Sequence, residues 1–261
     1  MTPFPTSCCS IALRQYSAIQ ALDVIAEAGF ESVELWYPHV ENLDKAELDH
    51  VAGHCAQLGL ATTVIAPYFS FTRGREPWLN SLRAAERVLQ VASLFHAKKI
   101  RTFIDIGPDG LPSERADESH WRAAVDGLRE LCAMDISTEF VVETHQNTLA
   151  NTLPATRRIV EEVARPNLRL NYQATTDFLN RGYLESLEAL LPLVSHMHWE
   201  QMRPDGTATY IEEPGLIDFE QLIGWLVARN YKGSASVEYC WQPVDEKRIK
   251  TAHQYLTRLL K

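Results

Sequence analysis

Four strand-like runs in the second half of the chain each end in a residue that can bind a divalent metal. These residues are Glu143 in EFVVETH, Gln173 in LRLNYQ, His198 in LVSHMHWE and Glu238 in SASVEYC. Carboxylate, imidazole and amide donors suit a borderline to hard cation, so the set predicts Mn, Mg, Co or Zn. Because the set contains no thiolate, it argues against a closed structural zinc site and favours an open, catalytic one.

The two glutamates also suit acid–base chemistry. A divalent ion that chelates neighbouring carbonyl and hydroxyl oxygens stabilises the enediolate formed when a proton is removed next to the carbonyl. Glu143 and Glu238 would then stand on either side of a substrate, each able to give or take the proton. The residue types therefore predict a catalytic metal site, provided that the fold brings the four runs together.

The elements that must position these residues repeat one alternation along the chain. Apolar, β-branched runs of strand length alternate with longer segments of helical period, as expected of βα units and a parallel sheet. We predict strands over 7–13, 32–36, 62–68, 99–105, 139–145, 168–173, 193–200 and 234–240. We predict helices over 17–28, 44–58, 76–96, 115–133, 155–164, 180–191, 218–229 and 245–260.

This alternation predicts an α/β fold, a single (β/α)8 TIM barrel that fills residues 1–261 as one domain. An open Rossmann sheet would require a GxGxxG turn after an early strand, and the sequence has none. Barrels of this kind carry their active sites at the C-terminal ends of the strands. All four metal-ligand candidates occupy that end, so one barrel mouth could collect them.

Strand alternation then selects the residues expected to surround a substrate. Side chains point to opposite faces in turn, and the polar face of each strand is expected to point inward. His145 joins the two glutamates as a catalytic candidate. The substrate-binding candidates are Arg101, His196, Glu34, Trp36 and Tyr68 on the strands, with Arg203 in the loop over 201–217.

Composition limits the classes of partner. The chain has 261 residues, 46% hydrophobic content and a formal charge of -9, which argues against a nucleic-acid backbone or an anionic membrane surface as its main partner. A small-molecule substrate is expected. We see no signal peptide or membrane span, and the five cysteines lack the spacing of a zinc knuckle, so we expect a cytoplasmic protein with reduced thiols. The oligomeric state is left open, with a homodimer as one option.

The chain resembles the xylose-isomerase-like (AP endonuclease family 2) TIM barrels over nearly its whole length. The resemblance rests on GFESVELW, KIRTF, ETHQNTLANTLPAT, NLRLNYQ, HMHWE and ASVEYCW. The long ETHQNTLANTLPAT segment looks most like the 3-dehydroshikimate dehydratase branch. The resemblance implies a metal held by Glu143, by the residue at position 173, by His198 and by Glu238, with Arg101 and His145 near the substrate.

Two positions depart from the family's pattern. Where the family usually has an aspartate ligand followed three residues later by a histidine, this chain has Gln173 and Thr176. The amide oxygen of Gln173 can still coordinate a metal, but it brings no negative charge, so we expect weaker metal binding. The missing histidine removes an acid or base of the dehydratase branch, while the paired glutamates that an isomerase or epimerase would use are intact.

These observations support three functions. The leading interpretation is a metal-dependent isomerase or epimerase that acts on a small polyhydroxylated carbonyl compound, namely a sugar, sugar phosphate or keto-acid. The second is a lyase of the 3-dehydroshikimate dehydratase type, favoured by the motifs and weakened by Thr176. The third is a ligand-binding barrel that has lost catalysis, an interpretation that rests on Gln173 in place of an aspartate ligand.

Overall fold

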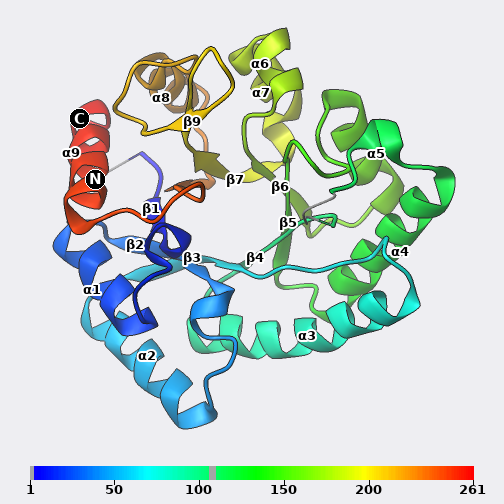
Figure 1. Cartoon of the computed structure of the whole chain (residues 1–261), viewed down its shortest axis with the longest axis horizontal. Coiled ribbons are helices and arrows are strands. Elements are labelled where there is room, and N and C mark those ends of the chain that lie inside the picture. The colour runs from blue at the N-terminus through cyan, green and yellow to red at the C-terminus, as the bar shows by residue number, and fades with distance from the viewer. Residues whose placement is uncertain (1–2, 106–109) are drawn as a thin grey trace. The chain divides into compact units, whose positions relative to one another are not determined.

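The computed structural model describes residues 3–105 and 110–261. Eight parallel strands form a closed barrel in the order β1-β10-β7-β6-β5-β4-β3-β2, which confirms the predicted fold class (Figure 1). The strands are β1 (Thr6–Cys9), β2 (Ser32–Trp36), β3 (Ala61–Ala66), β4 (Lys99–Thr102), β5 (Glu139–Glu143), β6 (Leu168–Tyr172), β7 (Val194–Trp199) and β10 (Ser234–Val237). Each predicted strand is therefore present, although most end earlier than expected.

Helices alternate with the strands as the helical periodicity predicts. They are α1 (Ala18–Glu27), α2 (Lys45–Gln57), α3 (Arg75–Leu94), α4 (Glu118–Met134), α5 (Leu153–Val163), α6 (Thr176–Arg181), α7 (Tyr183–Leu190), α8 (Phe219–Ala228) and α9 (Glu246–Leu259). Short 3-10 helices are η1 (Ser10–Leu13), η2 (Tyr37–His39), η3 (Ser113–Arg115) and η4 (Leu191–Leu193). Side-chain caps start several helices, among them Ser17 before α1 and Asp44 before α2, each within a capping box.

Three differences from the predicted elements have local causes. The strand predicted over 7–13 stops at Cys9. The backbone N–H of Trp36 donates to the Ser10 hydroxyl at 2.9 Å, which takes the place of a further backbone hydrogen bond between β1 and β2. The helix predicted over 180–191 is divided at Gly182, whose φ of 100° no helix allows. The loop over 201–217 contains a hairpin of β8 (Gln201–Met202) and β9 (Ala208–Thr209).

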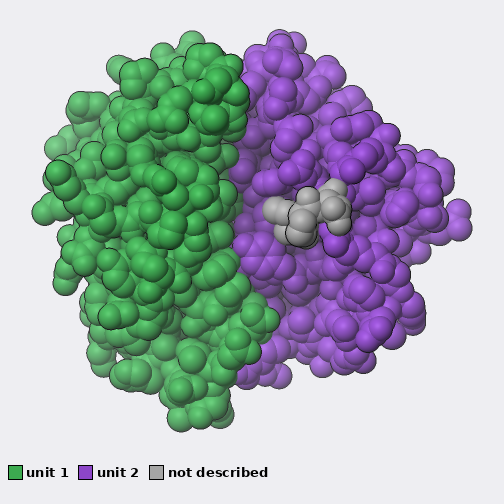
Figure 2. Space-filling view, viewed as in Figure 1, with its two compact units in different colours: residues 1–64, 94–97, 197–261 green, residues 65–93, 98–196 purple. Residues whose placement is uncertain are grey.

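The chain divides into two compact units, which Figure 2 distinguishes by colour. Unit 1 comprises residues 1–64, 94–97 and 197–261, and unit 2 comprises residues 65–93 and 98–196. The single domain expected from the length stays a prediction, so the two units are described separately.

In unit 1, β1 is the central strand of a parallel three-strand arrangement. Cys8 pairs with Val33 of β2 on one side and with Val237 of β10 on the other. Helix α1 packs against both α2 and α9, and α9 also contacts α8 (Figure 1). The buried side chains of α1 include Leu22 and Ile25, so this face of the sheet is covered by an apolar layer, as expected for a parallel sheet.

In unit 2, β4, β5 and β6 form a continuous parallel ladder. Ile100 of β4 pairs with Phe140 of β5, which in turn pairs with Leu168 of β6. Helix α4 packs against α5 (Figure 1). The ladder brings the C-terminal ends of β5 and β6 side by side, and so positions the polar residues at those ends.

No helix among the described residues is long and apolar enough to cross a membrane.

The end of α5 leads to a stability prediction. Ala164 caps this helix in the left-handed conformation, with φ 50° and ψ 46°, where an L residue with a Cβ costs about 1 kcal/mol or more. Its side chain is exposed, so Ala164→Gly removes strain without loss of packing. We expect a gain near 1 kcal/mol and a Tm higher by about 2–4 °C, measured by calorimetry.

The matched control is Ala56→Gly, at an exposed position inside α2. A glycine in a regular helix should instead lower stability by roughly 0.5–1 kcal/mol. Equal losses in both variants would contradict the assignment of strain to position 164.

Candidate active site

In unit 1, the imidazole of His198 lies between two carboxylates. Its Nε2 is 3.0 Å from both oxygens of Glu34, and its Nδ1 is 3.0 Å from Oε2 of Glu238. The three residues are at most 2% exposed. Buried ionisable groups persist only when paired or bound to a metal, so this cluster is the first candidate for a functional centre.

The register of the sheet explains why the two carboxylates lie at one level. Cys8 pairs with Val33 and with Val237, so the next residues, Glu34 and Glu238, fall in the row above it and on the opposite face. Glu34 is the third residue of β2, and Glu238 directly follows β10. Because β1 lies between β2 and β10, the two backbones are two strand spacings apart, roughly 9.6 Å, and the imidazole of His198 bridges their carboxylates.

The donor set fits a divalent cation. Two ligand atoms that each lie about 2.1 Å from one ion, at right angles, are roughly 3 Å apart, and Nδ1 of His198 is 3.0 Å from the Glu238 oxygen. Within unit 2 itself, Glu143 and His196 are residues whose side chains can ligate a metal. His196 is fully buried in β7.

In unit 2, Glu143 ends β5 beside a buried cation. Nη1 of Arg101 donates to Oε2 of Glu143 at 2.8 Å, and Nδ2 of Asn171 donates to the same oxygen at 3.4 Å. Arg101 and Glu143 are each 1% exposed. The guanidinium favours the ionised carboxylate, which is the form that a metal ligand or a general base requires.

The backbone of Gln173 is held to the residue after Glu143. The Thr144 hydroxyl donates to the Gln173 carbonyl at 2.8 Å and accepts from the Gln173 N–H, also at 2.8 Å. Gln173 directly follows β6 and is 4% exposed. This pair of hydrogen bonds between neighbouring strand ends gives positions 143 and 173 a fixed backbone separation.

Aromatic rings extend from Arg101 toward solvent. Its guanidinium lies 4.4 Å from the Phe103 ring centroid, and Tyr68, which is 41% exposed, stacks on Phe103 at 5.7 Å. His145 meets Phe103 edge-on at 5.5 Å. Tyr68 and His145, two of the residues predicted to contact substrate, therefore share one wall of unit 2.

Hydrogen bonding sets the tautomer of His145. Its Nδ1 accepts the Asn147 N–H at 3.3 Å, so the hydrogen of the neutral ring is on Nε2. His145 is half-buried. It can therefore donate a hydrogen bond from Nε2.

Trp36 belongs to a small cluster at the C-terminal end of β2. Its N–H donates to Ser10 Oγ at 2.9 Å, and Ser10 lies 3.0 Å from Nδ1 of His39. The His39 ring meets Trp36 edge-on at 5.1 Å. Burial lowers the pKa of His39 to about 4, so this imidazole is neutral at pH 7. From the sequence we expect His39 to be a surface or helix residue, and no motif marks its pairing with Ser10.

Arg203 lies in the β8–β9 hairpin, and its side chain binds residues of the same loop. Nη2 of its guanidinium is 2.6 Å from Oγ1 of Thr209 and 3.0 Å from Oε2 of Glu213. The side chain is 45% exposed. A substrate contact by Arg203 stays a prediction, and the substrate would have to compete with Glu213.

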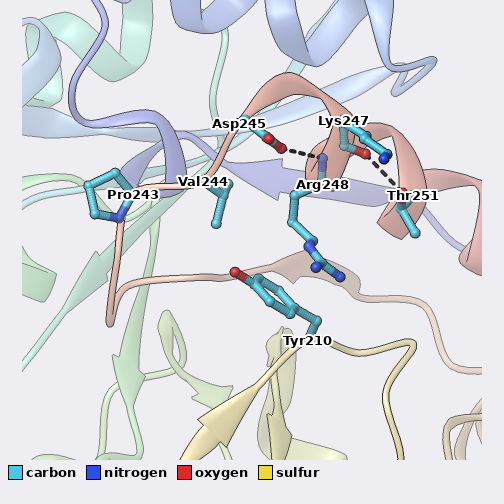
Figure 3. Close-up of a pocket in the computed structure, with 7 residues that line it drawn as sticks. All are labelled: Tyr210, Pro243, Val244, Asp245, Lys247, Arg248 and Thr251. Carbon is cyan, nitrogen blue, oxygen red and sulfur yellow. Dashed lines mark hydrogen bonds between the residues drawn. The ribbon is translucent and has the colours of Figure 1, made fainter.

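A separate pocket of about 500 Å³ lies between Tyr210 and the start of α9. Figure 3 shows the Arg248 side chain along the Tyr210 ring, and its guanidinium lies 3.6 Å from the ring centroid. The same guanidinium contacts Glu212. The positive charge of Arg248 is thus balanced by Glu212. None of the predicted site residues lines this pocket.

Comparisons with known proteins agree with the fold. A curated 3-dehydroshikimate dehydratase of Bacillus anthracis is 29% identical over 209 residues, covering 75% of this chain and 71% of the relative. The crystal structure of the probable 3-DHS dehydratase AsbF of Bacillus anthracis matches with a TM-score of 0.83 and 23% identity, over 97% of this chain and 98% of that one.

Two further solved structures share the fold. A xylose isomerase-like TIM barrel protein of Mycobacterium smegmatis, in complex with magnesium, has a TM-score of 0.75 and 16% identity, over 100% of this chain and 97% of that one. The 3-keto-D-glucoside 4-epimerase of E. coli has a TM-score of 0.73 and 19% identity, over 99% of each chain. The fold of this chain is thus shared by a dehydratase and an epimerase, and a barrel of the same fold has been crystallised with magnesium.

The family model described as a xylose isomerase-like TIM barrel matches residues 22–259. This match spans most of the chain and confirms the resemblance carried by the strand-end motifs. The protein therefore belongs to the xylose isomerase-like TIM barrel family.

Proposed function

We propose that the protein is a metal-dependent isomerase or epimerase of a small polyhydroxylated carbonyl compound. The observation that carries the proposal is the buried His198–Glu238 pair, whose 3.0 Å separation fits two ligands of one cation. Glu143 and Gln173, at the C-terminal ends of β5 and β6, would complete the set, because all strands of such a barrel end at one rim.

The residues of the chain have distinct parts in this proposal. Glu143 and Glu238 each exchange a proton with a substrate carbon next to the carbonyl. Arg101 keeps Glu143 ionised, and the wall of Tyr68, Phe103 and His145 lies against the substrate. When bound, a divalent ion such as Mn, Mg, Co or Zn would stabilise the negative charge that develops on the carbonyl oxygen.

A dehydratase acting on 3-dehydroshikimate is the second candidate, because the curated relative of that name is 29% identical to this chain. One observation favours the isomerase or epimerase over it. Thr176 is an exposed residue of α6 whose N–H donates to Gln146 at 2.9 Å, so position 176 offers no imidazole. Asp177 is already engaged by the Leu153 N–H and by Arg181, so it does not supply the missing carboxylate ligand, and this bears equally on both reactions.

Both glutamates should be essential for proton transfer. We expect Glu143→Gln and Glu238→Gln each to reduce exchange of a substrate C–H proton with solvent deuterium by about 10²–10⁴-fold, the range typical of acid–base groups. NMR or mass spectrometry on a panel of ketoses, inososes and keto-acids would measure this exchange. Glu139→Gln is the control, since Glu139 starts the same strand β5 at its opposite end; full activity in either strand-end variant would refute the assignment.

Gln173 should limit the affinity for metal. We expect Gln173→Asp to lower the Kd for Mn²⁺ by about tenfold, which corresponds to roughly 1.4 kcal/mol, because a buried carboxylate attracts a dication more strongly than an amide does. Gln146→Asp adds the same charge at an exposed position and should change the Kd little. An unchanged or higher Kd for Gln173→Asp in titration calorimetry would place residue 173 outside the metal's ligands.

Product mass separates the two reactions. An isomerase or epimerase gives a product of the substrate's mass, whereas dehydration of 3-dehydroshikimate loses water and yields a new aromatic ultraviolet band. We expect proton exchange with at least one ketose, inosose or keto-acid and little dehydration, because Thr176 carries no imidazole. Rapid growth of the ultraviolet band would favour the dehydratase instead, and absence of exchange with every compound would favour a ligand-binding barrel.

A further inference from the structure

We propose that Glu34 is a positioning residue, which holds His198 so that Nδ1 of the imidazole faces the metal. This inference rests on the proposed function and assigns Glu34 a role other than the substrate contact expected from its place on β2. It concerns residues of unit 1 alone.

The geometry separates the two nitrogens of His198 into different environments. Nε2 lies 3.0 Å from both Glu34 oxygens, and Nδ1 lies 3.0 Å from one oxygen of Glu238. A histidine that binds a metal through one nitrogen commonly donates its other N–H to a carboxylate, which fixes the ring and strengthens its donor atom. Glu34 occupies that second position, so Nδ1 is the nitrogen left for the metal.

Burial argues against a substrate contact by Glu34. Its side chain is 0% exposed, and so is that of His198. Glu238, on the other side of the ring, is 3% exposed. Glu238 is thus the one carboxylate of this group whose side chain reaches solvent at all, and a substrate would meet it before the fully buried Glu34.

The backbone of Glu34 is fixed in a way that suits a positioning role. It pairs with Cys9 of β1, and β1 also pairs with β10, which leads into Glu238. The two carboxylates are thus anchored to one continuous sheet. A fixed second carboxylate restricts the imidazole to one orientation, and this preorganisation is what a metal ligand needs.

The experiment compares Glu34→Ala and Glu34→Gln with the wild-type chain. Removal of such a carboxylate typically weakens metal binding by about 10–100-fold, and we expect this rise in the Kd for Mn²⁺ in Glu34→Ala, measured by EPR titration. Glu34→Gln keeps an oxygen that can accept the Nε2–H, so its Kd should rise less. If the Ala variant fails to fold, the isosteric Gln variant carries the test.

A spectroscopic measurement distinguishes positioning from general stabilisation. In the Co²⁺-loaded wild-type protein, the Nε2–H of His198 should give a paramagnetically shifted proton signal that is present in H2O and lost in D2O. Glu34→Ala should lose this signal to rapid solvent exchange or shift it. Thr63→Val is the matched control: Thr63 bonds Ser7 and the Val33 carbonyl within the same unit, at 3.1 Å each, and its loss should leave both Kd and signal unchanged.

The outcomes identify which hypothesis fails. A folded Glu34→Ala variant with the wild-type Kd and an unchanged Co²⁺ signal overturns the positioning role and leaves the metal centre intact. A variant with the wild-type Kd but a higher KM overturns it in favour of a substrate contact. Wild-type protein that binds neither Mn²⁺ nor Co²⁺ overturns the metal centre itself, and this inference with it.

Discussion

Burial of charge at the strand ends is the constraint on which the site depends. Glu34, His198 and Glu238 are each at most 2% exposed, and an uncompensated charge there would be strongly destabilising. When both ring nitrogens carry hydrogen, each of them can donate a hydrogen bond to the carboxylate on its side of the imidazole. Positive charge between the carboxylates, carried by the imidazole or by a bound cation, is therefore a condition for burying this cluster.

Unit 2 meets the same constraint with a different cation. Arg101 lies against the Phe103 ring and donates to Glu143, so the planar guanidinium is held on one side by an aromatic ring and at its edge by a carboxylate. A guanidinium keeps its charge at all relevant pH values. Glu143 is thus an ionised and rigidly placed carboxylate even without a metal, whereas the cluster in unit 1 depends on the state of an imidazole.

The sequence predicts the regular part of this architecture and fails where side chains choose distant partners. Strand periodicity identifies the ends of β5 and β6, and the motifs mark Glu143 and Glu238, because each signal is local. The partnership of Glu34 with His198 spans 164 residues and depends on sheet register and rotamer. The same holds for Ser10 and His39. The sequence leads one to expect a substrate contact at Arg203, but Glu213 of the same loop pairs with it, a contact that no periodicity encodes.

The two leading reactions share their first step and differ in the second. Isomerisation, epimerisation and dehydration can all begin with removal of a proton next to a carbonyl, which a carboxylate performs. Dehydration also needs a proton for the departing hydroxyl group. Neither Thr176 nor Asp177 at the start of α6 provides an imidazole. His145, whose Nδ1 accepts the Asn147 N–H, can offer an Nε2–H hydrogen bond to a leaving oxygen, but it could give that oxygen a proton only as the imidazolium, which would break the bond to Asn147. Dehydration therefore asks for an acid at the departing hydroxyl that isomerisation and epimerisation do not need.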